Sequence, residues 1–149
     1  MKLHEIQQKL KAPKNQRNTF GNYNYRNCED ILEAVKPLLG DAVLTISDEI
    51  VQVGDRFYVK ATATFKDKEV VTSATAFARE AIEKKGMDSA QITGAASSYA
   101  RKYALNGLFL IDDTKDPDST NKHGLEASRG LKKGYPALPE TSNDDDLPF

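Results

Sequence analysis

The chain has 149 residues, 39% hydrophobic and 29% charged, which is enough for one domain with a real core and too short for two. Its 21 cationic and 22 acidic side chains leave a formal net charge of -1, and its one cysteine, Cys28, excludes an internal disulfide and fits a reducing compartment. Met1–Lys14 is too polar for a signal peptide, and no apolar run reaches the roughly 20 residues that span a bilayer, so we expect a cytoplasmic globular protein without membrane contact.

The first predicted elements are a short helix and a basic arm. Lys2–Leu10 places Leu3, Ile6 and Leu10 on one helical face. Residues 12–18 are polar and basic with a proline, which is typical of an arm or loop. The first 26 residues hold six cations and one acid. Such a surplus suits a polyanionic partner, although ordinary surface charge explains it equally well.

A second helix and three strands follow. Residues 29–39 carry apolar side chains at helical spacing, with acids in the first turn and Gly40 just past the end. The pattern then changes to alternation, which puts five side chains on one face: Phe57, Val59, Ala61, Ala63 and Phe65. Polar turns at 54–55 and 66–68 predict an antiparallel meander of three strands: Ala42–Val53, Arg56–Phe65 and Glu69–Arg79.

The last predicted helix spans residues 89–107 and is capped by Asp88 or Ser89. Six side chains share the side that we expect to pack on the sheet: Ile92, Ala95, Ala96, Tyr99, Tyr103 and Ala104. Arg101 and Lys102 point outward from one turn, where they can contact phosphates. The alternative is that the tyrosines are core residues beside two solvated cations.

The order of these elements predicts an α+β fold in which an antiparallel three-strand meander is packed by helices, with a strand-strand-strand-helix core. Residues 108–111 predict a final strand or a docked turn. Apolar residues become few after Asp112, and residues 112–149 hold nine acids against five cations. We expect a domain over residues 1–118 with a basic N-terminal arm, then a disordered acidic linker and tail over residues 119–149.

Catalysis and cofactor binding are not indicated. The histidines are His4 and His123, no spacing of histidine and cysteine suits a metal, and no glycine-rich loop suits a phosphate. The acids that can in principle hold Mg²⁺ or Ca²⁺ are Asp112, Asp113, Asp116 and Asp118, but solvent-exposed acids at the end of the domain are the simpler explanation. We therefore expect a binding protein that is not an enzyme and has no cofactor.

Aromatic and basic residues alternate in two further places. Tyr23 and Tyr25 point the same way if their segment is extended, and aromatic rings stack on unpaired bases with about 1–3 kcal/mol per base. The alternative is that these tyrosines plug the edge of the core. Tyr58 lies between Arg56 and Lys60 on the outer face of its strand. The candidate nucleic-acid-binding residues are Arg17, Tyr23, Tyr25, Arg26, Arg56, Lys60, Arg101 and Lys102.

Three motifs resemble a known family. Phe20-Gly21-Asn22-Tyr23-Asn24-Tyr25-Arg26, the run Gly86–Leu105 and the acids Asp112–Asp118 are similar to the ERF (essential recombination function) family of phage single-strand annealing proteins, over roughly residues 14–118. The resemblance implies a protein of the bacterial host cytoplasm that binds single-stranded DNA and anneals complementary strands without ATP in phage recombination and DNA repair. It also implies homo-oligomers, as rings or helical filaments.

The chain ends in a second motif, formed by Asp144, Asp145, Asp146, Leu147, Pro148 and Phe149. It is similar to the C-terminal tip of bacterial single-stranded DNA-binding proteins (SSB). There the acids meet a basic rim and the phenylalanine fills an apolar pocket on a partner protein. The resemblance implies docking onto host proteins that recognise SSB tips; a solubilising tail, or one that covers the protein's own cationic groove, are the alternatives.

Two other functions stay open. A protective phage-type SSB would need a five-stranded OB barrel, which a helix rich in small residues does not suit. A nuclease using Asp112, Asp113 and Asp116 would cleave DNA only with Mg²⁺. Annealing of complementary strands without ATP separates both from the leading prediction.

Overall fold

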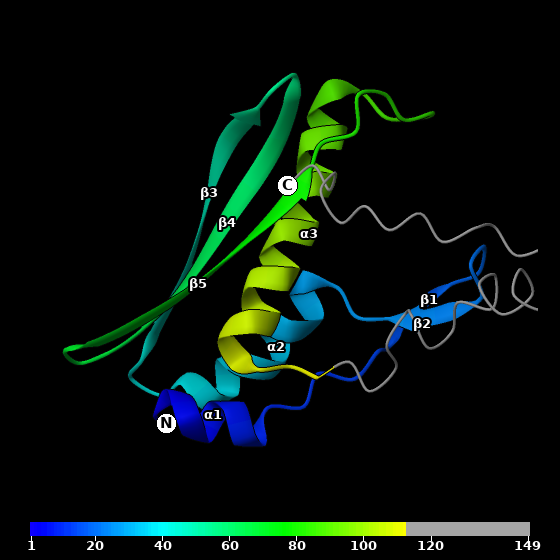
Figure 1. Cartoon of the computed structure of the whole chain (residues 1–149). Helices are drawn as coiled ribbons and strands as arrows, with labels where there is room; N and C mark the ends of the chain where they lie inside the picture. Colours follow the sequence, from blue (N-terminus) through cyan, green and yellow to red (C-terminus); the bar gives the residue numbers. More distant parts are fainter. Residues whose placement is uncertain (113–149) are drawn as a thin grey trace, which may run out of the picture. The chain divides into compact units, whose positions relative to one another are not determined.

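The computed structural model describes residues 1–112, so the acidic tail Asp144–Phe149, the acids Asp113–Asp118 and the predicted boundary at residue 118 lie outside the described residues. In chain order the elements are α1 (Leu3–Lys9), β1 (Gln16–Asn18), β2 (Tyr23–Tyr25), α2 (Cys28–Leu39), β3 (Val43–Val53), β4 (Arg56–Asp67), β5 (Val70–Arg79) and α3 (Ser89–Phe109) (Figure 1). The predicted α+β class and its antiparallel three-strand sheet are confirmed. No helix among residues 1–112 is long and apolar enough to cross a membrane.

The main sheet has the order β3-β4-β5, and both pairs are antiparallel. Each connection is a two-residue turn whose first residue has a positive φ: Gly54 at 61° and Lys68 at 54°. Such turns match the twist of the strands that they join. The second turn lies at Lys68–Glu69, slightly later than predicted, because β4 continues through Asp67.

The core lies between one face of the sheet and α3. Val59, Ala61, Ala63 and Phe65 of β4 are buried there, as their alternation predicted, whereas Phe57 at the strand's start is exposed. On α3 the residues that recur every four positions and meet the sheet are alanines: Ala96, Ala100 and Ala104. Their small side chains bring the helix axis close to the strands. Figure 1 shows α3 lying along the sheet, with α2 on the side of the helix that faces away from the strands.

The prediction that Tyr99 and Tyr103 pack on the sheet is wrong, because these side chains are 54% and 51% exposed. Helix α3 is rotated so that the alanine stripe, rather than the tyrosine stripe, faces β4 and β5. Phe65 on the inner face of β4 is fully buried, and a buried side chain of that size stabilises the fold by about 1.5–3 kcal/mol. Two tyrosine rings in the same gap would hold the helix away from the strands.

The ends of α3 follow from local chemistry and from packing. Asp88 caps the helix as predicted: its carboxylate accepts from the Gln91 amide at 2.9 Å, and the Gln91 side chain accepts from the Asp88 amide at 2.9 Å. The helix ends at Phe109 rather than near residue 107, and Leu108 and Phe109 are buried in its last turn. The short strand that we considered for residues 108–111 is therefore wrong.

The basic arm contains a two-stranded hairpin, β1–β2, that Figure 1 shows pointing away from the main sheet. The Arg17 guanidinium donates to the side-chain oxygens of Asn24, at 3.0 Å, and of Asn22. At the base of the hairpin Arg26 is buried, and its Nε donates to the Ala12 carbonyl at 2.7 Å. This hydrogen bond joins the two ends of the arm at the base of the hairpin. The Gln16 side-chain amide donates to Asp30 of α2 at 3.2 Å and so ties the hairpin to the domain.

Candidate nucleic-acid interface

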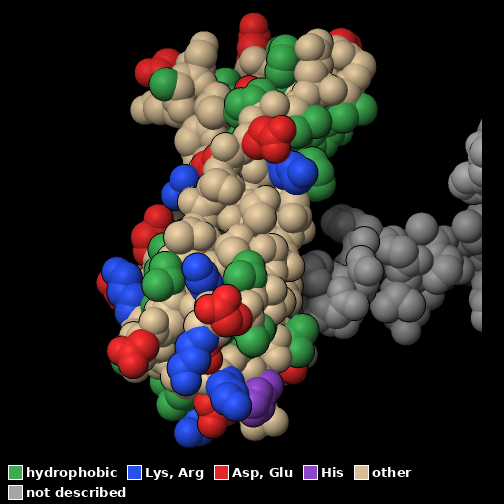
Figure 2. All heavy atoms as spheres, turned by 90° about the vertical axis from the view of Figure 1, so that its left-hand side faces the viewer, with side chains coloured by type: hydrophobic (Ala, Val, Ile, Leu, Met, Phe, Trp, Pro, Cys, Tyr) green, Lys and Arg blue, Asp and Glu red, His purple; other side chains and the backbone are tan. Residues whose placement is uncertain are grey.

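The face of the main sheet that points away from α3 is open. Side chains alternate between the two faces along each strand, so every second side chain of β3, β4 and β5 points to the open face. No element of residues 1–112 packs over this face, and its residues are exposed or half-buried. Figure 2 views the molecule from this side. Because a sheet with one solvated face is ordinary, its chemistry must decide whether it binds anything.

The charges on the open face are mostly positive. The register places four cations on it, Arg56, Lys60, Lys66 and Arg79, and one carboxylate, Glu49. An excess of cations on one face of the sheet is the charge distribution expected for a site that binds a polyanion.

Two aromatic rings lie among these cations. Tyr58 is paired with Arg79 across the β4–β5 ladder, and Lys60 is paired with Phe77. The Lys60 ammonium lies 6.0 Å from the centre of the Phe77 ring, at the limit of a cation–π contact. Phe77 is 53% exposed, so its ring is available to a ligand. Rings that stack on bases, next to cations that hold phosphates, are the two parts of a single-strand binding surface.

Between the charged residues runs a band of short hydroxyl side chains on the open face: Thr45, Ser47, Thr62, Thr64, Ser73 and Thr75. Across the β4–β5 ladder the hydroxyls of Thr64 and Ser73 are 2.9 Å apart. Figure 2 shows a broad band of uncharged side chains and backbone across the middle of this view. Short hydroxyl side chains let a bound chain approach the sheet closely, and they can donate to phosphate oxygens.

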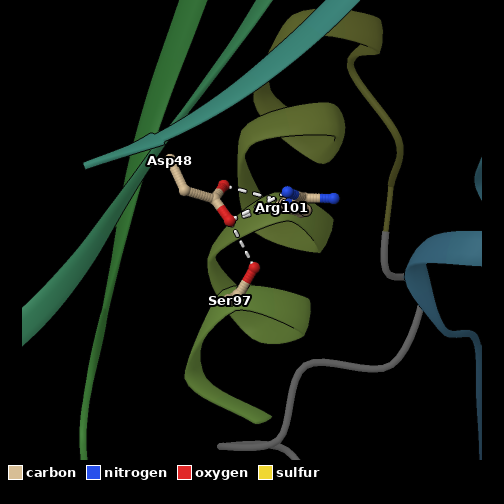
Figure 3. A network of polar contacts seen from close by, with 3 residues as sticks. All are labelled: Asp48, Ser97 and Arg101. Atoms are coloured by element: carbon tan, nitrogen blue, oxygen red, sulfur yellow. Dashed lines mark hydrogen bonds and ion pairs between the residues drawn. The ribbon is translucent and has the colours of Figure 1, made fainter. Parts of the chain in front are cut away.

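Arg101 lies on the other side of the sheet, where it forms a network with Asp48 of β3 and Ser97 of α3 (Figure 3). The Arg101 Nη2 donates to Asp48 Oδ2 at 2.9 Å, and the Ser97 hydroxyl donates to the same oxygen at 2.5 Å. Partial burial acts to raise the pKa of Asp48, but the hydrogen bonds from Arg101 and Ser97 and the charge of Arg101 outweigh it and leave the pKa below its ordinary value. Arg101 is therefore engaged by its own chain, and the network ties α3 to β3.

Lys102, the next residue, lies over the two exposed tyrosines of α3. Its ammonium is 4.9 Å from the ring centre of Tyr99 and 5.2 Å from that of Tyr103. The ring centres are 6.5 Å apart and the planes differ by 23°. Both tyrosines border a groove of about 270 Å³ that runs between α3 and the outer edge of β5. The residues Phe77, Arg79, Lys84 and Met87 also line it.

The structure distributes the predicted nucleic-acid residues over three places. Arg56 and Lys60 meet on the open face, Arg101 and Lys102 lie on α3, and Arg17, Tyr23, Tyr25 and Arg26 belong to the β1–β2 hairpin. Buried Arg26 cannot reach a ligand in this conformation. Sequence reasoning missed Lys66, Phe77 and Arg79. Phe77 and Arg79 could have been found from the sequence, because on the third strand they lie across from Lys60 and Tyr58 and alternation puts all four side chains on one face.

Metal chemistry has no support in the described residues. Within residues 1–112, no three side chains of histidine, cysteine, aspartate or glutamate gather closely enough to hold a metal ion. Of the acids considered for Mg²⁺ or Ca²⁺, Asp113, Asp116 and Asp118 lie outside this part of the chain.

The fold and the open face define an α+β protein whose helices cover one side of an antiparallel sheet and whose other side is exposed and cationic. A family model described as the ERF superfamily matches residues 1–136. The essential recombination function protein of Salmonella phage P22 is 67% identical over 140 residues, an alignment that covers 94% of this chain and 68% of that protein. The chain therefore belongs to the ERF superfamily, as its motifs indicated. No solved structure matches it.

Proposed function

We propose that this protein acts in phage recombination by binding single-stranded DNA on the open face of its sheet and annealing complementary strands without ATP. The observation that carries the proposal is the open face itself, where four cations and two aromatic rings surround a band of hydroxyls. Membership of the ERF superfamily and the name of the P22 relative support the recombination role.

The mechanism is physical rather than covalent. Cations such as Lys60 and Arg79 neutralise phosphates and release counterions, and each such contact adds about 0.7 to the salt slope of single-strand binding. Tyr58 and Phe77 offer stacking surfaces that do not depend on base identity. A DNA strand held along a shallow face keeps its bases accessible, so a second DNA strand can try different alignments with it until complementary bases pair. With both backbones partly neutralised, their repulsion falls and pairing is faster.

The test is annealing of complementary labelled oligonucleotides without ATP, together with binding measured over a range of salt. Replacing Lys60 and Arg79 by alanine should lower the salt slope by about 1.4 per protomer and slow annealing, because two phosphate contacts are lost. The control replaces two exposed helical cations, Lys9 and Lys36, and should leave the slope unchanged. Equal slopes for the two double variants would refute the open face as the binding surface.

The same assay separates the alternative functions. A protective SSB would bind the strands tightly and not anneal them. A nuclease would cleave them when Mg²⁺ is added. Either result would replace annealing as the function of this protein.

We also propose that the C-terminal residues Asp144–Phe149, which lie outside the described residues, dock onto proteins that recognise SSB tips. Acids followed by a terminal aromatic residue suit a basic rim around an apolar pocket. Deleting Leu147–Phe149 should abolish binding to a purified SSB-tip receptor and leave annealing intact. Retained binding would contradict the proposal.

A further inference from the structure

The β1–β2 hairpin contributes no side chain to the core that residues 1–112 form. Its rings Tyr23 and Tyr25 are absent from the buried cluster and from the side chains packed against it. Tyr23 is 51% exposed, and Phe20, in the turn between the two strands, is fully exposed. These rings therefore do not plug the edge of the core, and exposed apolar groups that gather in one place mark interaction sites.

The shape of the hairpin is held by its own polar groups. Asn18 Nδ2 donates to the Tyr23 hydroxyl at 3.0 Å, and the Gly21 amide donates to Asn18 Oδ1 at 2.9 Å. Asn22 has a positive φ of 53°, a conformation that asparagine adopts more readily than most residues. A Cβ added at Gly21 would collide with the Tyr23 ring, so glycine lets this ring lie against the turn. The turn that carries Phe20 is thus fixed without an apolar core.

The chemistry of the hairpin and its flanks favours nucleic acid as the ligand. Residues 11–26 include no acid and, after residue 13, no aliphatic side chain. They include four cations: Lys11, Lys14, Arg17 and Arg26. Arg17 donates to the side-chain oxygens of Asn22 and Asn24, which carry no charge to cancel its own and leave it further N–H groups for a phosphate. Exposed rings by themselves also suit a protein partner, but rings among cations without an acid favour single-stranded nucleic acid, which offers phosphates and bases together.

A ring at the tip of a hairpin reaches base faces only where the bases are unpaired. Inside a duplex both faces of a base are covered by its neighbours, and a base step must be opened before a side chain can enter. In a single strand the base faces are free to stack on aromatic side chains. The exposed ring of Phe20 is therefore suited to unpaired bases and not to a closed duplex.

We propose that the β1–β2 hairpin is a second DNA contact, in which the Phe20 ring stacks on an unpaired base and Arg17 contacts a neighbouring phosphate. The inference rests on the proposed function for its ligand, single-stranded DNA, and adds a site outside the main sheet that recognises base faces. Pairing covers those faces, so the contact is lost when two strands anneal. The hairpin therefore makes the protein bind each unpaired strand more tightly than the annealed product.

The first experiment compares the affinity of the full chain for an oligothymidine with its affinity for an abasic oligomer of the same length, which keeps the phosphates and lacks the bases. Phe20→Ala should weaken binding of the oligothymidine about fivefold or more and leave the abasic oligomer unaffected, because one stacked base is lost. Phe20→Tyr keeps a ring and should bind as the wild type does. The matched control is Phe57→Ala, at a ring that is 46% exposed on the other face of the sheet, and it should change neither affinity. Equal losses on both oligomers, or no loss on the oligothymidine, would overturn the proposal.

The second experiment locates the contact by photocrosslinking. A single strand in which 5-iodouracil replaces thymine crosslinks to aromatic side chains that stack on it, and the irradiated complex with the full chain is digested with trypsin. Cleavage after Arg17 and after Arg26 releases the peptide Asn18–Arg26, which contains Phe20, and we expect this peptide to carry the crosslink. The same sequence in a duplex should crosslink to it about fivefold less or weaker still. Crosslinks only in other peptides, or an equal yield with the duplex, would contradict the proposal.

A protein partner for the hairpin is the competing outcome. It would appear as a Phe20→Ala variant that binds DNA as the wild type does and that loses self-association in sedimentation velocity without DNA. That result would reject the hairpin as a DNA contact.

Failure of the hairpin contact can be told apart from failure of the open face. Phe20 is uncharged, so Phe20→Ala lowers the ratio of the two affinities and leaves the salt slope unchanged. Replacing Lys60 and Arg79 by alanine removes phosphate contacts, so it lowers the salt slope and leaves the ratio unchanged. A change in only one of the two measurements supports one site and rejects the other.

Discussion

Replacing Arg101 with alanine is expected to weaken the fold and to leave the salt dependence of DNA binding unchanged. The Arg101 Nε lies 3.0 Å from Oδ1 and 3.1 Å from Oδ2 of Asp48, and its Nη2 lies 2.9 Å from Oδ2. These contacts join α3 to β3, whereas the helix packs mainly on β4 and β5. The guanidinium therefore acts within the protein, on the opposite side of the sheet from the open face.

The magnitude follows from geometry and exposure. Hydrogen bonds to charged groups contribute about 1.5–3 kcal/mol when sheltered, and exposed ion pairs about 0.2–1 kcal/mol. The Arg101 side chain is 42% exposed and that of Asp48 is 24% exposed, so solvent screens the pair and the lower range governs. We expect a coupling of about 1 kcal/mol between the two residues. A loss of stability of that size lowers the midpoint of thermal unfolding by about 4 °C in a domain of this size.

The assay is a double-mutant cycle in urea with the wild type, Arg101→Ala, Asp48→Ala and the double variant. The neighbouring substitution Lys102→Ala serves as a control and should show no coupling to Asp48. Salt-dependent DNA binding of Arg101→Ala is measured alongside. A coupling below about 0.3 kcal/mol, together with a salt slope lowered by about 0.7, would show that Arg101 contacts phosphate instead. Contact of Lys102 with phosphate stays a prediction, which the same control variant tests.

Acid should remove the coupling. In the folded protein the pKa of Asp48 lies below its ordinary value of about 3.9, so its stabilisation is present above that pH and is lost as pH falls through the lower, folded-state pKa. The cycle repeated near pH 3 should give a smaller coupling than at pH 7; the same coupling at both would contradict the pKa direction. Two substitutions on α3 test its packing. Ala100→Leu should destabilise the protein by about 1–3 kcal/mol, because Ala100 is fully buried against the sheet. Gly94→Ala should stabilise it by about 0.4–1 kcal/mol, since an added Cβ meets nothing within 4 Å. Urea unfolding measures both, and the opposite sign in either would show that α3 lies on the sheet through another face.

The local elements could be predicted from the chain because their causes are local. Helix α2 follows from its apolar spacing, its acids in the first turn and Gly40 at its end, and Asp88 caps α3 through residues three positions away. The meander follows from alternation and from polar turns, and alternation alone placed Val59 and Phe65 in the core. The hairpin in the basic arm was not predicted, because its strands have only three residues each.

The sequence by itself therefore determined the elements, their order, the inner face of β4 and, through its long motif, the family. Only the tertiary structure decided which stripe of α3 faces the sheet, since alanine and tyrosine stripes are both compatible with helical spacing. That rotation brought Arg101 to Asp48, 53 residues earlier in the chain, and left Tyr99 and Tyr103 outside. Pairing of β5 with β4 likewise brought Phe77 to Lys60. The physical reason is that contacts between distant segments depend on how closely two surfaces pack, and no local pattern records that distance.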